Sequence, residues 1–165
     1  MPHLEIEHLF QQMLLHREQT ADPASLGAWL RQQIIHKAFP DLSHLPFSPC
    51  TYTRTRVAQE SLRADHHYEA LILRWDEQAK TSIHGHPAFS FYAVISGCFE
   101  MDFFTHQGVS GLRYEGSQRF RPGEVIWSLG QQGRYDNFIH RVTCLESGCT
   151  FHVYSDDGRK GCQYT

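Results

Sequence analysis

The spacing of hydrophobic positions divides the chain into two parts. Up to about residue 40, apolar side chains recur at helical intervals, at Leu4, Phe10, Met13 and Leu14 and again at Leu26, Trp29, Leu30 and Ile34. Asp22 suits the N-cap of the second helix and Pro23 its first position. Pro40 and Pro46 then interrupt the pattern. The sequence therefore predicts two helices followed by a loop.

From residue 51 onward, short apolar or alternating runs replace the helical spacing. They are separated by Gly, Asp and Pro, and they cover residues 51–58, 68–75, 89–96, 98–104, 124–129, 138–145 and 149–155. Many short strands without intervening helices are typical of a β-sandwich or a barrel. At 165 residues the chain fits one domain. We therefore predict a single domain over residues 1–165, in which a helical part (1–46) packs against a mainly β barrel (47–165).

Composition narrows the classes of function. The net charge is −3 and no basic run occurs, so nothing favours nucleic acid or an anionic membrane surface. No apolar stretch reaches the roughly 20 residues of a membrane span, and the acidic, Gln-rich start is wrong for a signal peptide. The five cysteines are odd in number and form no CxxC motif. We therefore expect free thiols in a cytoplasmic protein.

Three histidines suggest a metal site. His84 and His86 are two residues apart, so on a strand both rings point to the same face. This spacing arises about once by chance in a chain with 12 histidines, so two ordinary histidines remain the alternative. His140, within another apolar run, is the candidate third ligand. Imidazole suits Zn, Fe, Cu and Ni alike, so these ligands alone do not select the metal.

The order of these features resembles the two-motif pattern of the cupin family. His84 and His86 are followed by Gly97, by a Pro122-Gly123 turn and then by His140. The resemblance implies a small double-stranded β-helix that holds one metal ion. Cupins usually supply a glutamate about four residues after the second histidine, but Ser90 occupies that position here. Three neutral imidazoles would leave coordination positions open, as in non-heme Fe(II) oxygenases.

Five fragments in order narrow the resemblance further. They are YTRTRV, ILRWDE, SIHGHP, IHRV and FHVYS, and over residues 50–155 they look like the thiol dioxygenases, most of all cysteine dioxygenase. This resemblance implies Fe(2+) bound by His84, His86 and His140. It also implies a substrate-binding group of Arg54, Tyr52 and Trp75, and a relay of Thr150, His152 and Tyr154 whose tyrosine hydroxyl points at the iron site.

Simple physical chemistry is compatible with these roles. Thr150, His152 and Tyr154 alternate, so they face one side of a strand and could bond in sequence. The planar fork of Arg54 fits a carboxylate. Taken without the resemblance, the sequence favours a surface ion pair for Arg54, and Tyr154 could be a buried aromatic with a satisfied hydroxyl.

Departures from the family pattern mark the expected differences. Ser90 stands where many animal members have the cysteine that forms a thioether with the tyrosine, so we predict an unmodified Tyr154. Asp156 and Asp157 replace a family Pro-Pro pair at the pocket rim. Arg56 faces the same side as Arg54, either as a second cation for a dicarboxylate or in solvent.

The sequence thus predicts a monomeric dioxygenase that adds both atoms of O2 to the sulfur of L-cysteine and forms cysteine sulfinate. Its partners would be a small thiol and O2, without nucleic acid or membrane. Arg54 favours cysteine, because relatives that act on 3-mercaptopropionate usually have glutamine there. The alternatives are another thiol carboxylate such as 3-mercaptopropionate or mercaptosuccinate, a cupin that binds metal or ligand without catalysis, and a cupin enzyme of different chemistry.

Overall fold

The computed structural model describes residues 4–61, 67–109 and 111–165. Two helices, α1 (Ile6–Gln19) and α2 (Ser25–Ile34), precede the strands. The strands and one short 3-10 helix follow as β1 (Tyr52–Gln59), β2 (Glu69–Trp75), β3 (Ile83–His86), β4 (Phe89–Gln107), β5 (Gly111–Phe120), β6 (Val125–Leu129), β7 (Asn137–Tyr154), η1 (Gly158–Lys160) and β8 (Gln163–Tyr164). The predicted mainly β class is confirmed.

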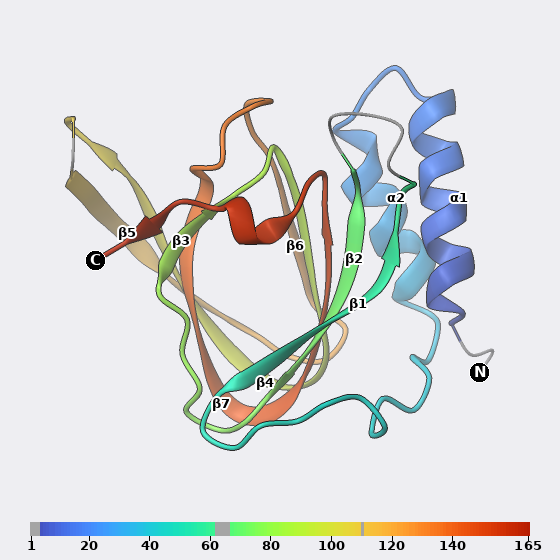
Figure 1. Cartoon of the computed structure of the whole chain (residues 1–165), viewed down its shortest axis with the longest axis horizontal. Coiled ribbons are helices and arrows are strands. Elements are labelled where there is room, and N and C mark those ends of the chain that lie inside the picture. The colour runs from blue at the N-terminus through green and yellow to red at the C-terminus, as the bar shows by residue number, and fades with distance from the viewer. Residues whose placement is uncertain (1–3, 62–66, 110) are drawn as a thin grey trace.

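The antiparallel sheet curls into a barrel whose open end faces the viewer in Figure 1. β7 is its central strand, because it pairs with β2, β3 and β4 at once. β4 in turn also pairs with β5 and β6. The pairing of β7 with both β2 and β3 brings residues that are distant in sequence to one end of the barrel.

Two pairs of predicted short strands are in fact two long ones. Residues 89–96 and 98–104 belong to β4, and residues 138–145 and 149–155 largely to β7. The register between β4 and β7 shifts at Ser96 and Cys98, so these strands bend without ending. Gly97 permits this bend, because its φ is +85° and an added Cβ would lie 2.5 Å from the Glu146 carbonyl oxygen.

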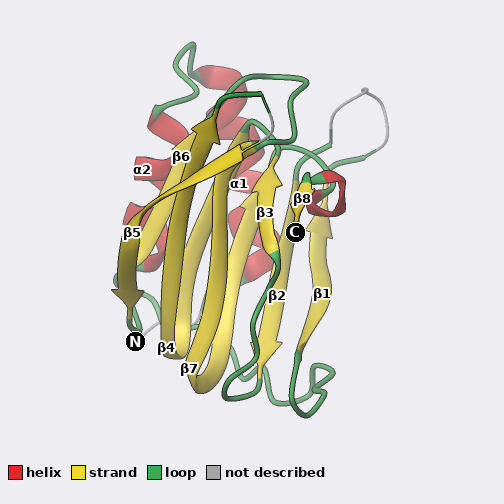
Figure 2. Ribbon diagram, turned by 90° about the vertical axis from the view of Figure 1, so that its left-hand side faces the viewer, coloured by secondary structure: helices red, strands yellow, loops and turns green. Residues whose placement is uncertain are grey.

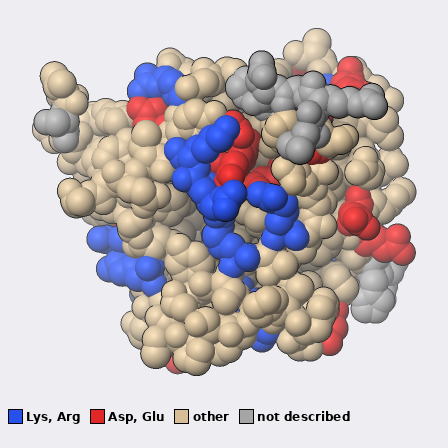
Figure 3. All heavy atoms as spheres, in the orientation of Figure 1, with Lys and Arg blue, Asp and Glu red and all other residues tan. Residues whose placement is uncertain are grey.

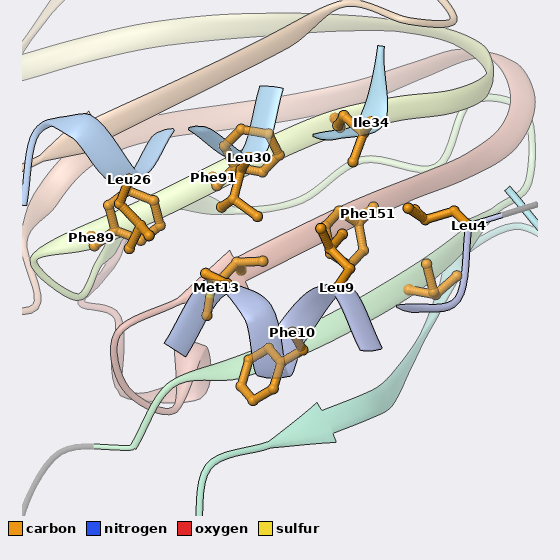
Figure 4. Close-up of a cluster of buried hydrophobic side chains, with 14 of the residues drawn as sticks. Leu4, Leu9, Phe10, Met13, Leu26, Leu30, Ile34, Phe89, Phe91 and Phe151 are labelled. Carbon is orange, nitrogen blue, oxygen red and sulfur yellow. The ribbon is translucent and has the colours of Figure 1, made fainter. Parts of the chain in front are cut away.

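The helices cover one face of the sheet (Figures 1 and 2). Apolar side chains of both helices form a buried cluster with the phenylalanines of β4 and β7, among them Phe10, Met13, Leu26, Leu30, Phe89, Phe91 and Phe151 (Figure 4). The predicted start of the second helix was wrong by two residues. Asp22 Oδ1 accepts the Ala24 N–H at 2.9 Å in a preceding turn, and regular helix begins at Ser25.

A second buried cluster fills the barrel interior from the opposite face of the strands. It contains Leu71, Leu73, Trp75, Val94, Phe99, Met101 and Val142. Leu73, Trp75 and Val142 also border the cavity at the open end, so this core forms the floor of the site described next. No helix of the described ranges is long and apolar enough to cross a membrane.

Candidate active site

Three histidines converge at the open end of the barrel. His84 and His140 are register partners on β3 and β7, and His86 follows on β3. The candidate ligand atoms of the three residues all lie within 4.8 Å of one another. The Nε2 atoms of His86 and His140 are 3.2 Å apart. The cluster therefore has the donor set and the spacing of a three-histidine metal site.

Backbone carbonyls orient two of these rings. The Nδ1 of His84 lies 2.8 Å from the Ser82 carbonyl, and the Nδ1 of His140 lies 2.8 Å from the Phe138 carbonyl. Since a carbonyl can only accept, each Nδ1 carries the proton and each Nε2 keeps its lone pair. Such outer hydrogen bonds fix the tautomer that binds a metal ion.

The third ring completes the fit to a cation. His86 Nδ1 is buried and has no hydrogen-bond partner among the described residues. Without an ion, its proton belongs on Nε2, where His140 Nε2 accepts it. Burial holds the pKa of both rings well below the usual histidine range, so both are neutral near pH 7. To hold a metal ion together with His84 and His140, His86 would carry its single proton on Nδ1, which frees the Nε2 lone pair.

The histidines border a cavity of about 240 Å³. This is smaller than the roughly 300–1,000 Å³ of sites for drug-sized ligands, so the cavity suits a small molecule. All of the site residues proposed from the sequence line it except Thr150, which lies behind His152. Among the described residues its lining contains two arginines, Arg54 and Arg159, and no Asp or Glu. Figure 3 shows Lys and Arg side chains gathered across this face.

Arg54 presents unused hydrogen-bond donors to the cavity. Its side chain is 30% exposed, and its nearest anion is Glu69, with Nη2 3.9 Å from Oε1. That distance is too long for a hydrogen bond, and Arg54 makes none within the described ranges. A partly exposed guanidinium with free donors, beside a candidate cation site, is suited to bind a carboxylate.

Arg56 is not the second cation of the cavity. It faces the same side of β1 as Arg54, as the alternation predicts, but its Nε donates to Glu69 Oε2 at 2.9 Å and it does not line the cavity. The second guanidinium comes instead from Arg159 on η1. Arg159 donates to Asp157 through Nε and Nη2, which leaves Nη1 without a protein partner among the described residues.

A chain of hydrogen bonds runs behind the cavity. Trp75 Nε1 donates to Thr150 Oγ1 at 2.8 Å. Thr150 Oγ1 lies 2.7 Å from His152 Nε2, and His152 Nδ1 lies 3.0 Å from the Tyr154 hydroxyl. The last two contacts follow the alternation of the strand. The first depends on the register of β2 with β7, in which Leu73 faces Thr150 and Trp75 faces Gly148.

The direction of this chain follows from its first member. An indole N–H can only donate, so Thr150 accepts from Trp75. The buried Thr150 hydroxyl proton has no acceptor among the described residues other than His152 Nε2, so Thr150 donates to that nitrogen. Burial lowers the pKa of His152 to about 3, so the ring is neutral and its single proton lies on Nδ1. Nδ1–H then donates to the Tyr154 oxygen. The Tyr154 hydroxyl proton is therefore left to donate into the cavity.

Ring contacts connect this chain to the other groups. Tyr154 stacks on His86 with ring centroids 5.1 Å apart, which places the tyrosine beside the histidine cluster. Tyr52 stacks on Trp75 at 4.4 Å. Burial raises the pKa of Tyr154 above the ordinary value, so its hydroxyl stays protonated. Ser90 faces Tyr154 in the β4–β7 register, and all five cysteines are free.

The C-terminal segment forms the rim of the cavity. The resemblance placed Asp156 and Asp157 at this rim, but sequence reasoning missed Gly158, Arg159 and Gln163, which line the cavity. Asp156 is buried and bonds the Tyr135 hydroxyl at 2.6 Å and Lys160 Nζ at 3.0 Å. Those contacts hold the residues that follow across the barrel mouth, and Gly158, Arg159 and Gln163 line the cavity there. Nothing in the periodicity of residues 156–165 indicates that they return to the site.

Comparison with known proteins places the fold. The chain matches no protein-family model and no curated protein sequence. A cupin 2 domain-containing protein from Halorhodospira halophila is similar at 9% identity over 74% of this chain and 76% of that one, with a TM-score of 0.52. An 11S globulin from Wrightia tinctoria is similar at 13% identity and a TM-score of 0.53, over 71% of this chain.

A structure described as a DMSP lyase is similar over 59% of this chain, at 16% identity and a TM-score of 0.44. The present chain spans 44% of that lyase chain and 28% of the globulin chain. The likeness to the cupin 2 protein shows that the chain has the cupin fold. With its three converging histidines, it is a cupin-fold protein with a candidate metal site.

Proposed function

We propose that this protein is a thiol dioxygenase that converts L-cysteine to cysteine sulfinate. One observation carries the proposal. A single small cavity combines three neutral histidines, a guanidinium with free donors and a buried tyrosine whose proton is directed inward. A protein that only bound a metal ion would need neither the arginine nor the tyrosine. The five sequence fragments that resemble thiol dioxygenases contribute these same residues.

The proposed cofactor is Fe(2+), held by His84, His86 and His140. When bound, iron supplies the redox chemistry that joins both atoms of O2 to the thiol sulfur. The fit rests on the Nε2 lone pairs of His84 and His140, on the carbonyl-anchored Nδ1 protons of these two rings, and on a cluster that contains no charged ligand among the described residues. The full positive charge of the ion would then be available to an anionic substrate.

The protein would orient the substrate through its carboxylate. Arg54 has free N–H donors, and the neighbouring Tyr52 is held by its stack on Trp75. Anchoring the carboxylate fixes the distance from that group to the sulfur, and such positioning supplies a large part of the rate enhancement of many enzymes. Tyr154 would donate its proton in a hydrogen bond to the reacting groups, while His152 keeps the hydroxyl in that direction.

Oxygen uptake by the iron-loaded, reduced protein tests this function. L-cysteine, 3-mercaptopropionate, mercaptosuccinate and cysteamine would be compared, with mass spectrometry of the products. We expect uptake with L-cysteine, sulfinate as the product, and loss of activity in both Arg54→Gln and His86→Ala. Uptake with none of the thiols at full iron occupancy would refute the dioxygenase proposal.

A second candidate is a dioxygenase of a thiol that carries two carboxylates. The specific observation in its favour is that Arg159 lines the cavity together with Arg54, whereas no carboxylate among the described residues lines it to receive the ammonium group of cysteine. A higher kcat/KM for mercaptosuccinate than for L-cysteine, reversed in Arg159→Gln, would identify this substrate class. A preference for mercaptosuccinate that persists in Arg159→Gln would remove Arg159 from that explanation.

A further inference from the structure

Glu69 is a buried carboxylate next to the cavity that does not line it. It lies at the start of β2 and is 2% exposed. Its Oε2 accepts from Arg56 Nε at 2.9 Å, and its Oε1 accepts the backbone N–H of Gly158 at 2.9 Å. Its remaining partner is Arg54, whose Nη2 is 3.9 Å from Oε1. One carboxylate thus connects β1, β2 and the C-terminal segment.

These contacts attract Arg54 without using its donors. Each Glu69 oxygen already accepts a hydrogen bond from another group, and Arg54 remains beyond hydrogen-bond distance. Because Glu69 is shielded from water, its charge is screened less than that of a surface carboxylate and attracts the neighbouring Arg54 guanidinium. The guanidinium is therefore held near one position while its N–H groups stay free for a ligand.

The Gly158 contact extends this control to the cavity wall. A Cβ added at Gly158 would lie 2.8 Å from the Tyr154 ring and 3.0 Å from Arg54 Nη2. The backbone of Gly158 therefore packs directly against both side chains. By accepting the Gly158 N–H, Glu69 fixes the surface on which the Arg54 guanidinium rests.

We propose that Glu69 is a positioning residue that aims Arg54 at the carboxylate of the substrate, through its charge and through its hydrogen bond to Gly158. The inference rests on the proposed function in one respect, namely that a thiol carboxylate is the ligand. It concerns how the site binds an anion, and it can be tested without turnover.

Two effects of Glu69 oppose each other, and two variants separate them. Removal of the negative charge alone would strengthen anion binding, because the net charge of the group formed by Glu69, Arg54 and Arg56 rises from +1 to +2. Loss of position would weaken it. Glu69→Gln keeps the length of the side chain and removes its charge. Glu69→Asp keeps the charge, but its shorter side chain moves the carboxylate away from Arg56 and Gly158. A positioning role predicts weaker carboxylate binding in both.

The chain offers a matched control at Glu60. This carboxylate also binds an arginine, Arg17, at 2.6 Å and a backbone N–H, that of Tyr68, at 3.1 Å, but it does not line or contact the cavity. Glu60→Gln removes an equivalent ion pair elsewhere on the surface of the barrel. Arg54→Gln serves as the reference for complete loss of carboxylate recognition.

The experiment is anaerobic calorimetry of the ferrous protein with 3-mercaptopropionate and with 1-propanethiol, which has a methyl group in place of the carboxylate. The Kd of 1-propanethiol divided by the Kd of 3-mercaptopropionate is the ratio that measures the preference for the carboxylate. We expect both Glu69 variants to reduce this preference about tenfold, the effect of losing one charge-assisted hydrogen bond of the fork, with the Kd of 1-propanethiol unchanged. Glu60→Gln should leave the ratio unchanged.

An unchanged ratio in Glu69→Asp, or a larger ratio in Glu69→Gln, would overturn the proposal. The negative charge of Glu69 alone would then explain its effect on carboxylate binding. If Glu69→Gln does not fold, Glu69→Asp decides the question by itself. The result is separable from the proposed function. A wild-type protein that prefers the carboxylate thiol yet oxidises no thiol refutes only the dioxygenase, whereas active protein with unaltered Glu69 variants refutes only this inference.

Discussion

The hydroxyl of Thr150 is the connection on which the directed hydrogen-bond chain depends. It lies at 0% exposure between Trp75 Nε1 and His152 Nε2. Thr150→Val preserves the shape and removes the hydroxyl, so a buried donor and a buried acceptor both lose their partner. Each such loss costs about 1–3 kcal/mol, so we expect the free energy of unfolding to fall by about 2–6 kcal/mol.

Urea unfolding of the metal-free protein, analysed by linear extrapolation, measures this loss. A double-mutant cycle with Trp75→Phe isolates the hydrogen bond from the cavity that the smaller ring leaves. Trp75→Phe should cost about 1–2 kcal/mol less in the Thr150→Val background than in wild type, since there it removes a donor that is already unpaired. Thr143→Val, on the same strand, is the control and should change stability by less than about 0.5 kcal/mol.

Additive effects of Thr150→Val and Trp75→Phe would refute the hydrogen bond between Trp75 and Thr150 on which this chain depends. The same substitutions should also affect the reaction. Without the Thr150 hydroxyl, the neutral His152 ring is free to carry its proton on Nε2, and the Tyr154 proton can then turn toward His152. We expect lower kcat in Thr150→Val and near wild-type kcat in Thr150→Ser, which keeps the hydroxyl.

Three further predictions address other parts of the site. Burial lowers the pKa of His152 to about 3, against about 6.5 for an unfolded histidine, so the unfolded chain binds more protons between these values and stability falls as the pH drops. Between about pH 7 and 4.5, the free energy of unfolding measured in urea should fall by about 2.5 kcal/mol more in the wild type than in His152→Gln. Equal decreases in the two proteins would contradict a buried, neutral His152 ring. Gly158→Ala should lower kcat/KM at least about tenfold, because the added Cβ would lie 2.8 Å from the Tyr154 ring and 3.0 Å from Arg54. Unchanged kinetics would show that these two side chains can shift without any effect on the reaction. His86→Ala should abolish stoichiometric metal binding by elemental analysis, whereas His106→Ala, which removes an exposed ring bonded to Asp136, should retain it; equal metal content in the two variants would exclude the histidine cluster as the binding site.

Local sequence patterns were sufficient to predict those site contacts that join residues close together in the sequence. The Thr150–His152–Tyr154 contacts join residues two apart on one strand, so the alternation of side chains brings them together. His84 and His86 share a face for the same reason. The strand-like texture from residue 51 onward correctly predicted a mainly β fold.

Contacts that depend on the pairing of distant strands could not be predicted from local sequence patterns. The bond from Trp75 to Thr150 exists because β2 pairs with β7 across 75 residues of chain. Arg159 reaches the cavity because several tertiary contacts hold the C-terminal segment in place, among them the hydrogen bonds of Asp156 with Tyr135 and of Gly158 with Glu69. β5 was not predicted, because its residues are largely exposed and their polar composition gives no apolar alternation.

The role of Arg56 illustrates the same limit. Alternation correctly gave the side on which it faces, but not the buried acid that occupies it. Glu69 is a charged residue near the start of an otherwise apolar run, so the sequence alone favours a solvent-exposed position at the end of the strand. The fold instead encloses it between two arginines and the Gly158 backbone, where its charge is compensated.

Isotope labelling tests the central claim most directly. Iron-loaded protein would be supplied with L-cysteine under ¹⁸O2, and the product would be analysed by mass spectrometry. Our account predicts cysteine sulfinate in which both sulfinate oxygens carry the label, and no such product from His140→Ala. Unlabelled or singly labelled sulfinate, or disulfide as the only product, would contradict dioxygenation at this site.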